Sequence, residues 1–325
     1  MYILSAKIEI GDFIFNSINE VEITKTVEEL VDTAVIKMPT KFKVRQNNEL
    51  KYTEEVIKVG DPVKITLAYE GKYEGIEFIG FVARIKTKIP LEIHCEDAMW
   101  LLRRKNITKA FGKTTMKAIL EEVVKDTPVK LSKRIPDVPL DKYIIKDANG
   151  TQVLQSLKEN MAMTVFLEDD GSLYCGLQQG TNIGQRVIYD LNYNLVENNL
   201  EFKTADDKKI KVKYTYIDSK NNKKSIEFGD KDGELKTYHT SIVSDEKKLE
   251  EMAKAEIQKL KYDGFEGDIT SFLLPYATRG MAAEIRDKEH KNREGNYFIK
   301  SVVTTFGTSG ARRKVTLGTK VGTAL

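Results

Sequence analysis

The sequence predicts an α+β protein that is mainly β, with two similar β-modules flanking a small α/β unit. Residues 60–97 and 279–319 each read as three strands in a row, and the two stretches echo one another. Between residues 106 and 185 the spacing of apolar residues changes from a period of two to a period of 3.6. Strand patterns return from residue 186. The two copies lie too far apart in the chain for a solenoid or a propeller.

The echo is visible residue by residue. A glycine starts the first strand of each copy, at Gly60 and at Gly280. A charged, glycine-containing turn follows. A long alternating strand then carries a Phe-Ile pair near its start, Phe78-Ile79 in one copy and Phe298-Ile299 in the other. A third strand returns after a break. A duplicated module of this kind suits a protein that builds a ring with more modules than chains, and it points to no catalysis.

The first domain is expected to be all-β and to span residues 1–105. Period-two alternation, or enrichment in β-branched and aromatic residues, predicts strands at residues 2–10, 18–26, 33–38, 62–69, 77–88 and 90–96. The connection at residues 39–59 is polar and long for a hairpin. Loops of that length are usually functional or bound to a partner. We therefore expect this segment to leave the sheet and reach a neighbouring molecule.

Residues 106–185 are expected to form a small α/β domain of two helices and a hairpin. The first helix has Thr114 or Thr115 as its N-cap, and its apolar face is Met116, Ile119, Leu120, Val123 and Val124. Thr151 is expected to cap the second helix, whose apolar face is Val153, Leu154, Leu157 and Met161. The segment TVFLEDDGSLYCGL then reads as two strands joined at Asp170-Gly171, a pair suited to a tight turn.

The third domain is expected to span residues 186–325. Turn-forming segments at residues 198–199, 218–223 and 229–233 have the spacing of an antiparallel sheet. A helix at about residues 245–261 interrupts the strands, with Ser244 or Asp245 as its cap. Its apolar stripe is Leu249, Met252, Ala253, Ile257 and Leu260. We expect this helix to be an insertion that packs beside the C-terminal β-domain.

Composition excludes several classes of protein. The chain has 325 residues, of which 41% are hydrophobic and 31% charged, as in a soluble globular protein of two or three domains. A net charge of +3 is too small to argue for binding to nucleic acid. The start MYILSAKIEIGDF lacks the pattern of a signal peptide, and no apolar run approaches the ~20 residues that span a bilayer. We expect no membrane anchor and no sequence-specific recognition of nucleic acid.

The basic residues gather near the C-terminus. Residues 279–325 contain ten Lys and Arg against four Asp and Glu, a local net charge of +6. A cluster within one turn-like stretch is the candidate for docking an acidic partner, namely Arg286, Lys288, Lys291 and Arg293. The alternative is a solvated, turn-rich face without a partner.

A search for catalytic and metal-binding patterns is negative. His94, His239 and His290 lie in different modules, without the paired spacing that holds a metal. No nucleophile elbow, dinucleotide fingerprint or phosphate-binding loop occurs. The acidic pairs Asp169-Asp170 and Asp206-Asp207 lie in turns, where aspartate is favoured for its bonds to the backbone. The sequence therefore predicts no catalytic, cofactor-binding or metal-binding residue, unless folding brings distant carboxylates together.

The two cysteines, Cys95 and Cys175, lie in separate strand-like segments. We expect both to be buried, reduced and without a catalytic role. The string His94-Cys95-Glu96-Asp97 contains the residue types of a nucleophile and a base. Neighbours along a strand point to opposite faces, however, so His94 and Cys95 cannot act as a direct pair.

The order of these segments resembles that of phage tail baseplate hub proteins. The stretches EVEITKTVEELVDTAVIKMP (20–39), VGDPVKITLAYEG (59–71), EFIGFVARI (77–85) and HCEDAMWLLRR (94–104) resemble the opening β-domain of that family. The family includes the late control protein D group and is similar to the hub part of type VI secretion spike proteins. Residues 150–177 look like its middle segment. Residues 267–287 and 295–318 look like its closing β-domain.

The resemblance implies a specific architecture and assembly. Residues 1–105 and 186–325 would be two tube-like β-barrel domains, and three chains would form a pseudo-six-fold ring. Such a homotrimer is a structural, non-enzymatic hub of a contractile injection system that adapts a six-fold tail tube to a three-fold spike. The implied partners are the tail tube protein, the spike, other baseplate proteins and a tape measure protein. The implied location is the baseplate of the virion tail, assembled in the cytoplasm of the bacterial host.

One departure from the family concerns the C-terminus. Type VI spike proteins continue into an oligosaccharide-binding-like domain and a β-helix needle, whereas this sequence ends in GTKVGTAL. We therefore expect the spike to be a separate protein.

Two alternatives come from other functional classes. Some tail hubs carry cell-wall-degrading domains, so a lysozyme-like or peptidase-like unit at residues 106–185 would make this chain an enzyme. The two helices and the hairpin expected there leave little room for a cleft. A carbohydrate-binding β-protein would need exposed aromatic residues. Trp100 is the only Trp and lies in the apolar run AMWLL, which favours packing in a core.

Overall fold

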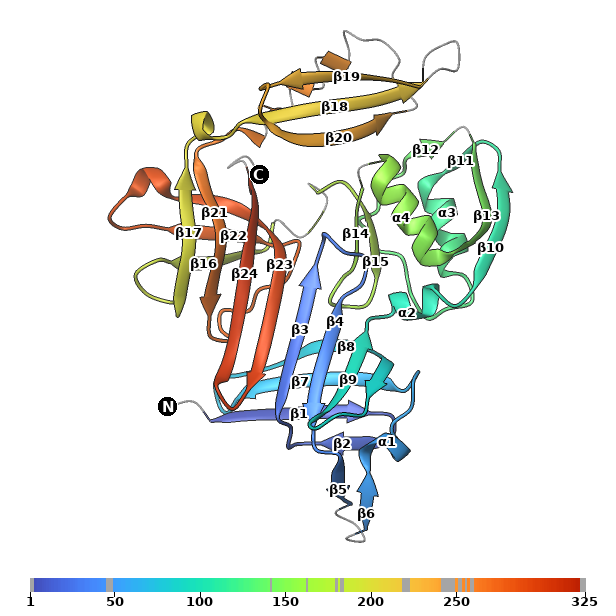
Figure 1. The fold of residues 1–325 in the computed structure, drawn as a ribbon, viewed down its shortest axis with the longest axis vertical. Helices are drawn as coiled ribbons and strands as arrows, with labels where there is room; N and C mark the ends of the chain where they lie inside the picture. Colours follow the sequence, from blue (N-terminus) through green and yellow to red (C-terminus); the bar gives the residue numbers. More distant parts are fainter. Residues whose placement is uncertain are drawn as a thin grey trace.

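The computed structural model describes residues 3–44, 49–140, 142–161, 163–178, 181, 184–217, 223–240, 249–250, 253–254, 256–257 and 260–321. Strands dominate and helices are few and short, which confirms the predicted α+β, mainly β class (Figure 1). Among the described residues, no helix combines the length and the hydrophobicity that crossing a membrane requires.

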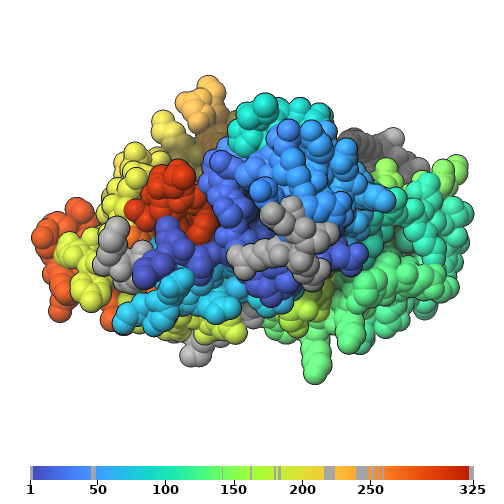
Figure 2. All heavy atoms as spheres, turned by 90° about the horizontal axis from the view of Figure 1, so that it is seen from below, coloured from blue at the N-terminus to red at the C-terminus, as the bar shows by residue number. Residues whose placement is uncertain are grey.

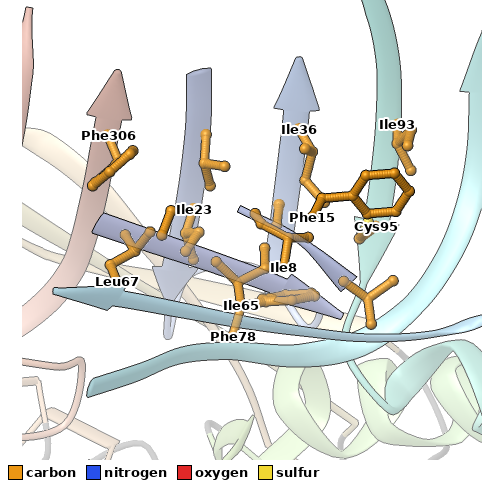
Figure 3. Packing of buried hydrophobic residues seen from close by; sticks show 14 of the residues in the cluster. Ile8, Phe15, Ile23, Ile36, Ile65, Leu67, Phe78, Ile93, Cys95 and Phe306 are labelled. Atoms are coloured by element: carbon orange, nitrogen blue, oxygen red, sulfur yellow. The ribbon is translucent and has the colours of Figure 1, made fainter. Parts of the chain in front are cut away.

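The N-terminal module is an antiparallel sheet. Its strands are β1 (Leu4–Ile10), β2 (Phe13–Phe15), β3 (Glu20–Thr26), β4 (Thr33–Met38), β7 (Pro62–Tyr69), β8 (Tyr73–Lys86) and β9 (Leu91–Glu96). They pair in the order β3-β4-β9-β8-β7-β1-β2. Strands β1 and β7 cross beneath β3 and β4, so that Ile8 and Ile65 face Ile23 and Ile36 across the core (Figure 3). Burial of this apolar layer provides the main driving force for folding.

Residues 39–59 leave the sheet. They form a small hairpin of β5 (Lys41–Lys43) and β6 (Leu50–Tyr52), followed by the short helix α1 (Thr53–Val56). The ring of Phe42 packs at its base against Phe13 and Phe15, with ring centres 5.7 and 5.0 Å apart respectively. The hairpin projects from one end of the molecule, at the bottom of Figure 1.

The middle unit packs helices against short strand pairs. Its elements are α2 (Met99–Leu102), β10 (Asn106–Phe111), β11 (Thr114–Thr115), α3 (Met116–Val124), β12 (Pro139–Leu140), β13 (Tyr143–Asn149), α4 (Gly150–Met161), β14 (Thr164–Leu167) and β15 (Leu173–Gly176). The hydroxyl of Thr115 accepts a hydrogen bond from the amide of Ala118, as expected of an N-cap. The β14–β15 hairpin turns at Gly171, whose φ is +81°.

The predicted cap of the second helix is wrong by two residues. The Asn149 side chain accepts hydrogen bonds from the amide of Gln152 and from the hydroxyl of Thr151, at 3.0 and 2.8 Å. Asn149 therefore fills the capping role that we expected of Thr151. Asparagine is as good an N-cap as threonine or better, and the helix begins one residue after it.

The C-terminal module contains the second copy of the β pattern. Its elements are β16 (Arg186–Asp190), β17 (Glu197–Lys203), the 3-10 helix η2 (Ala205–Asp207), β21 (Gly264–Ser271), β22 (Ala282–Arg286), the 3-10 helix η3 (Lys291–Arg293), β23 (Gly295–Gly307) and β24 (Gly310–Val321). They pair as β17-β21-β24-β23-β22-β16, the last pair being parallel. Seen from below, the N-terminal module lies between the C-terminal module and the middle unit (Figure 2).

A separate small sheet is inserted between β17 and β21. It consists of β18 (Ile210–Ile217), β19 (Lys223–Gly229) and β20 (Glu234–Thr240), and it has a small core of its own. Most of the helix expected at residues 245–261 lies outside the described residues. The described residues between Leu249 and Leu260 are helical, and Leu249 and Ala253 are buried against the inserted sheet.

The two modules correspond over five neighbouring strands, β3-β4-β9-β8-β7 in one and β17-β21-β24-β23-β22 in the other. They differ beyond these strands, because β1 pairs antiparallel with β7 whereas β16 pairs parallel with β22. The amide of Gly60 donates to the carbonyl of Val82 and the amide of Gly280 donates to that of Ile299, at 2.8 and 2.9 Å. Both glycines have positive φ, +96° and +84°. The predicted echo is therefore real, but the expected alignment of Phe78-Ile79 with Phe298-Ile299 is wrong. The true counterpart is Phe81-Val82, because β8 begins with an extra stretch that pairs with β7.

The modules do not form separate closed barrels. In the described part of the chain, one sheet of 13 strands runs through both modules, and it stays open. The reason is the pairing of β23 with β3, which uses the edge that β23 would need to close its own module. The two-barrel layout expected from the family is thus absent within the single chain as described.

Candidate assembly surface

Eight neighbouring strands of the large sheet span both modules. Their order is β17-β21-β24-β23-β3-β4-β9-β8, and we refer to them as the eight-strand run. In β3 the side chains of Val21 and Ile23 are buried, whereas Glu22 between them is exposed. The period-two alternation gives each strand one face toward a core and one face that is polar. We call the second face the polar face.

Charges of both signs cover the polar face. Cross-strand ion pairs join Lys37 to Glu20 at 2.9 Å and Lys314 to Asp268 at 3.1 Å. Glu92 accepts from Lys88 at 2.7 Å, and this contact is the largest cause that lowers the pKa of Glu92. A partly exposed pair such as Lys37 with Glu20 contributes little to stability. The polar face is therefore a hydrated surface and not a site that selects one small ligand.

The two halves of the run are joined at β3 and β23. These strands pair antiparallel over seven residues, from Ser301 opposite Thr26 to Gly307 opposite Glu20. The joint makes a single rigid sheet out of two modules that are far apart in sequence. Each chain therefore presents two modules, side by side, that share the same order of five strands.

A buried ion pair lies behind this joint. The guanidinium of Arg313 on β24 binds the carboxylate of Glu77 on β8 through two bonds, of 2.7 and 3.1 Å. Both side chains are 1% exposed. Burial alone would lower the pKa of Arg313, but the attraction of the Glu77 carboxylate outweighs it and raises that pKa. Bidentate geometry makes this the strongest type of charged contact, and it fixes one module against the other.

A second charged cluster joins all three parts of the chain. Arg279, from the C-terminal module, binds Asp32 at 2.5 Å and Asp169 at 3.2 Å. Asp32 belongs to the N-terminal module and Asp169 to the middle hairpin. Lys25 also binds Asp169, at 2.9 Å. The cluster borders a small cavity of about 150 Å³.

Two carboxylates that border this cavity, those of Asp32 and Asp97, accept hydrogen bonds from backbone amides. Asp97 accepts from the amides of Asp32 and Met99, both at 2.9 Å. Asp32 accepts from the amide of Thr26 at 3.1 Å. Burial, together with the nearby charge of Asp32, raises the pKa of Asp97 to about 8. A raised pKa in a cavity is a feature of catalytic acids, but here the oxygens hold turns in place.

The four predicted docking residues lie in one region, around β22 and η3. Arg286 pairs with Glu284 of its own strand at 2.8 Å, and Lys288 lies 3.5 Å from Asp190. The guanidinium of Arg293 lies over the ring of Phe202, 5.4 Å from its centre, and Lys291 is exposed. Acidic residues of the same turn lie among them. Their role in docking remains a prediction.

The other residues considered in the sequence are dispersed. Cys95 is buried in the N-terminal core and Cys175 in the core of the middle unit, where burial raises the pKa of the Cys175 thiol to about 12. Trp100 stacks on Phe81 with ring centres 5.2 Å apart. The guanidinium of Arg104 lies 4.1 Å from the Trp100 ring centre. No cluster of His, Cys, Asp and Glu that could hold a metal occurs among the described residues.

Sequence reasoning missed the charged residues that join the parts. Arg279 and Arg313 were counted in the basic excess of the C-terminal segment, yet each is at most 2% exposed. The one signal for Arg279 was its place directly before Gly280, at the start of the repeated module. Arg313 and Glu77 had no such signal, because their partnership spans more than two hundred residues.

Comparison with known proteins identifies the fold. No model of a protein family and no curated protein matches this sequence. The structure is similar to a 43 kDa tail protein of prophage MuSo2 from Shewanella oneidensis, with a TM-score of 0.67 and 14% identity over 97% of this chain and 98% of the other. A tail protein from Neisseria meningitidis matches with a TM-score of 0.66 and 14% identity, over 98% and 97% of the two chains.

A third similar structure comes from a secretion machine. It is an E. coli component of the type VI secretion system, described as structurally similar to the bacteriophage T4 tail proteins gp27 and gp5. Its TM-score is 0.59 with 9% identity, over 95% of this chain and 76% of the other. The chain therefore has a phage tail protein fold that is shared with type VI secretion components. The resemblance to baseplate hub proteins predicted from the sequence is confirmed at the level of the fold.

Proposed function

We propose that this chain is the structural hub of a phage tail or tail-like injection machine. Three copies form a ring that adapts a six-fold tail tube to a three-fold spike. The observation that carries the proposal is the presence of two matching modules in one chain, joined edge to edge through β3 and β23. Three chains then supply six modules. The similarity of the fold to phage tail proteins supports this reading.

The polar face lines the channel of the ring in this proposal. Each chain contributes the eight-strand run, so three chains together supply twenty-four strands. The buried face of the run packs against β1, β7, β16 and β22, which lie outside the channel. Each of the two modules thereby acts as a tube-like domain, with its wall completed by neighbouring modules. A hydrated, mixed-charge wall lets a cargo pass without binding it tightly.

The proposed partners are the tail tube protein, the spike, other baseplate proteins and a tape measure protein, with the virion tail as the location. We propose no enzymatic activity. The acidic residues gathered around Arg279 are held by backbone amides and by cations of the chain itself. The middle unit, where a cell-wall-degrading activity would lie, is filled by a continuous apolar core.

The proposed three-fold ring predicts a particle in solution with the mass of three chains. We expect native mass spectrometry and light scattering to find trimers, at high concentration or with the tube protein bound. A chain that stays monomeric in the presence of tube protein contradicts the hub.

The basic cluster is proposed to dock a spike or baseplate neighbour. Changing Arg286, Lys288, Lys291 and Arg293 together to Glu should impair that joining without unfolding the chain, since exposed charges contribute little to the core. Joining should also weaken with salt, because such charges are screened over ~10 Å at 0.1 M. A charge-matched control reverses Lys105, Lys113, Lys117 and Lys125 of the middle unit. Normal joining of the first variant at low salt would leave the cluster as a solvated surface.

A further inference from the structure

The eight-strand run ends at two open strand edges. At one end, β17 pairs with β21 on one side and with no described strand on the other. At the other end, β8 pairs with β7 as far as Phe81, and from Arg84 to Lys86 it pairs with β9 alone. The outer side of this last segment has no strand partner in the part of the chain that the structure describes. The two edges are the opposite ends of the eight-strand run.

The pairing of β3 with β23 within the chain shows which kind of strand partner the edge of β8 lacks. Its counterpart β23 pairs with β22 as far as Phe298, and from Ser301 onward it pairs with β3. Both strands have a register shift at the same place, after Val82 in β8 and after Ile299 in β23. The bulge turns the second half of each strand away from its first partner. In β23 the freed edge is covered by β3, whereas in β8 no described strand covers it.

Strand β17 is the counterpart of β3. Both have seven residues, and each occupies the same position beside its antiparallel neighbour, with Glu20 opposite Lys37 and Glu197 opposite Thr270. Lys37 and Thr270 are themselves equivalent through their pairing with β9 and β24. The edge of β17 that no described strand covers is therefore equivalent to the edge that β3 uses to bind β23.

We propose that the edge of β8 in one copy of this chain pairs antiparallel with β17 of a second copy. The register follows from the internal joint: Arg84 lies opposite Lys203, Ile85 opposite Phe202 and Lys86 opposite Glu201. This inference rests on the ring proposed above and specifies how its chains are joined. The surfaces on the two copies differ, so repetition of the contact closes a ring if the rotation allows it.

The side chains at the two edges are complementary. Ile85 and Phe202 are half-buried hydrophobic residues at the margins of the two module cores. They would meet and join those cores. On the polar face, β8 presents Arg84 and Lys86 and β17 presents Glu197 and Glu201. Opposite charges on facing strands stabilise a sheet. Lys203 faces Arg84, but its charge is already balanced by Glu266 at 3.2 Å.

A disulfide trap tests the register. Residues directly opposite in antiparallel strands have Cβ atoms ~4.5–5.5 Å apart, close to the distance that a disulfide spans. The variant Lys86→Cys with Glu201→Cys should form a bond between copies on mild oxidation. The control Lys86→Cys with Glu197→Cys moves one thiol four residues along the strand, about 13 Å away, and should not. Cys95 and Cys175 are buried and do not compete. The two single-cysteine variants check that each substitution leaves folding unchanged.

The number of linked chains separates this inference from the ring itself. We expect denaturing electrophoresis of the oxidised variant to show products that stop at three chains. A ladder that extends beyond three would support the edge pairing and overturn the three-fold ring. A wild-type trimer whose variant forms no cross-link would overturn the edge pairing and leave the ring intact. Equal cross-linking of the control would overturn the register, and a chain that is monomeric at all concentrations would overturn both proposals.

Discussion

Replacing Glu77 with Leu is expected to lower the free energy of unfolding by ~3–5 kcal/mol. The change leaves the guanidinium of Arg313 without its carboxylate at a position where the side chain is 1% exposed. An uncompensated buried charge has a cost of this size. Unfolding by guanidinium chloride, followed by circular dichroism, measures the difference. The hydroxyl of Tyr73 also loses its acceptor, since it donates to Glu77 at 2.5 Å.

The double variant Glu77→Leu with Arg313→Met separates charge from packing. Replacing both partners by apolar residues of similar volume removes the uncompensated charge, so most of the lost stability should return. A matched control removes the neighbouring exposed pair, with Asp268→Leu and Lys314→Met, and should change stability by about 1 kcal/mol or less. A double variant as unstable as Glu77→Leu alone would show that the pair acts through its shape and its carbonyl contacts.

Stability is expected to fall as the pH rises from about 5 to about 8. Burial raises the pKa of Asp97 to about 8 in the folded chain, against about 3.9 when unfolded. The folded state therefore binds this proton more tightly. Its contribution is complete below the unfolded pKa and is lost as the pH rises through the folded one. The slope is at most about 1.4 kcal/mol per pH unit for one proton. Burial raises the pKa of Asp32 as well, which acts in the same direction.

The contribution of Asp169 to folding stability has the opposite pH dependence, and it does not change between pH 5 and pH 8. Burial would raise the pKa of its carboxyl, but Lys25 and Arg279 lower it below its usual range. Its contribution is therefore lost only as the pH falls below about 4. The variant Asp97→Asn should flatten the slope between pH 5 and pH 8, whereas Asp12→Asn, at an exposed position, should keep it. An unchanged slope in Asp97→Asn would assign the pH dependence to other groups.

The strand pattern of this protein could be predicted from its sequence because it depends on local alternation. Strands β3 and β4 fall at residues 20–26 and 33–38, close to the expected 18–26 and 33–38. The two glycines at the start of the copies could also be predicted, because glycine is the residue that adopts a positive φ most readily. The match between Phe78 and Phe298 failed, since similar residue pairs occur twice along β8. The hydrogen bonds that the amides of Gly60 and Gly280 donate, and the strand registers beside them, separate the two alignments.

The joint between the modules could not be predicted in this way. Pairing of β3 with β23 depends on the fold of everything between them, and neither strand has a residue that indicates its partner. The buried charges were misread for a related reason. A lysine or arginine in a sequence is assigned to the surface by default, and only a partner such as Glu77 makes burial of Arg313 possible.

The same joint sets the order in which the protein can be completed during synthesis. Thr26 and Lys300 are hydrogen-bonded across 274 residues of sequence. On the ribosome, β3 emerges early and keeps an unpaired backbone edge until the last strands have been made. Contacts of such long range form slowly, and open strand edges template aggregation in the meantime. A chain cut before β23 would keep that edge exposed, so premature termination near the C-terminus should produce insoluble protein although most residues are present.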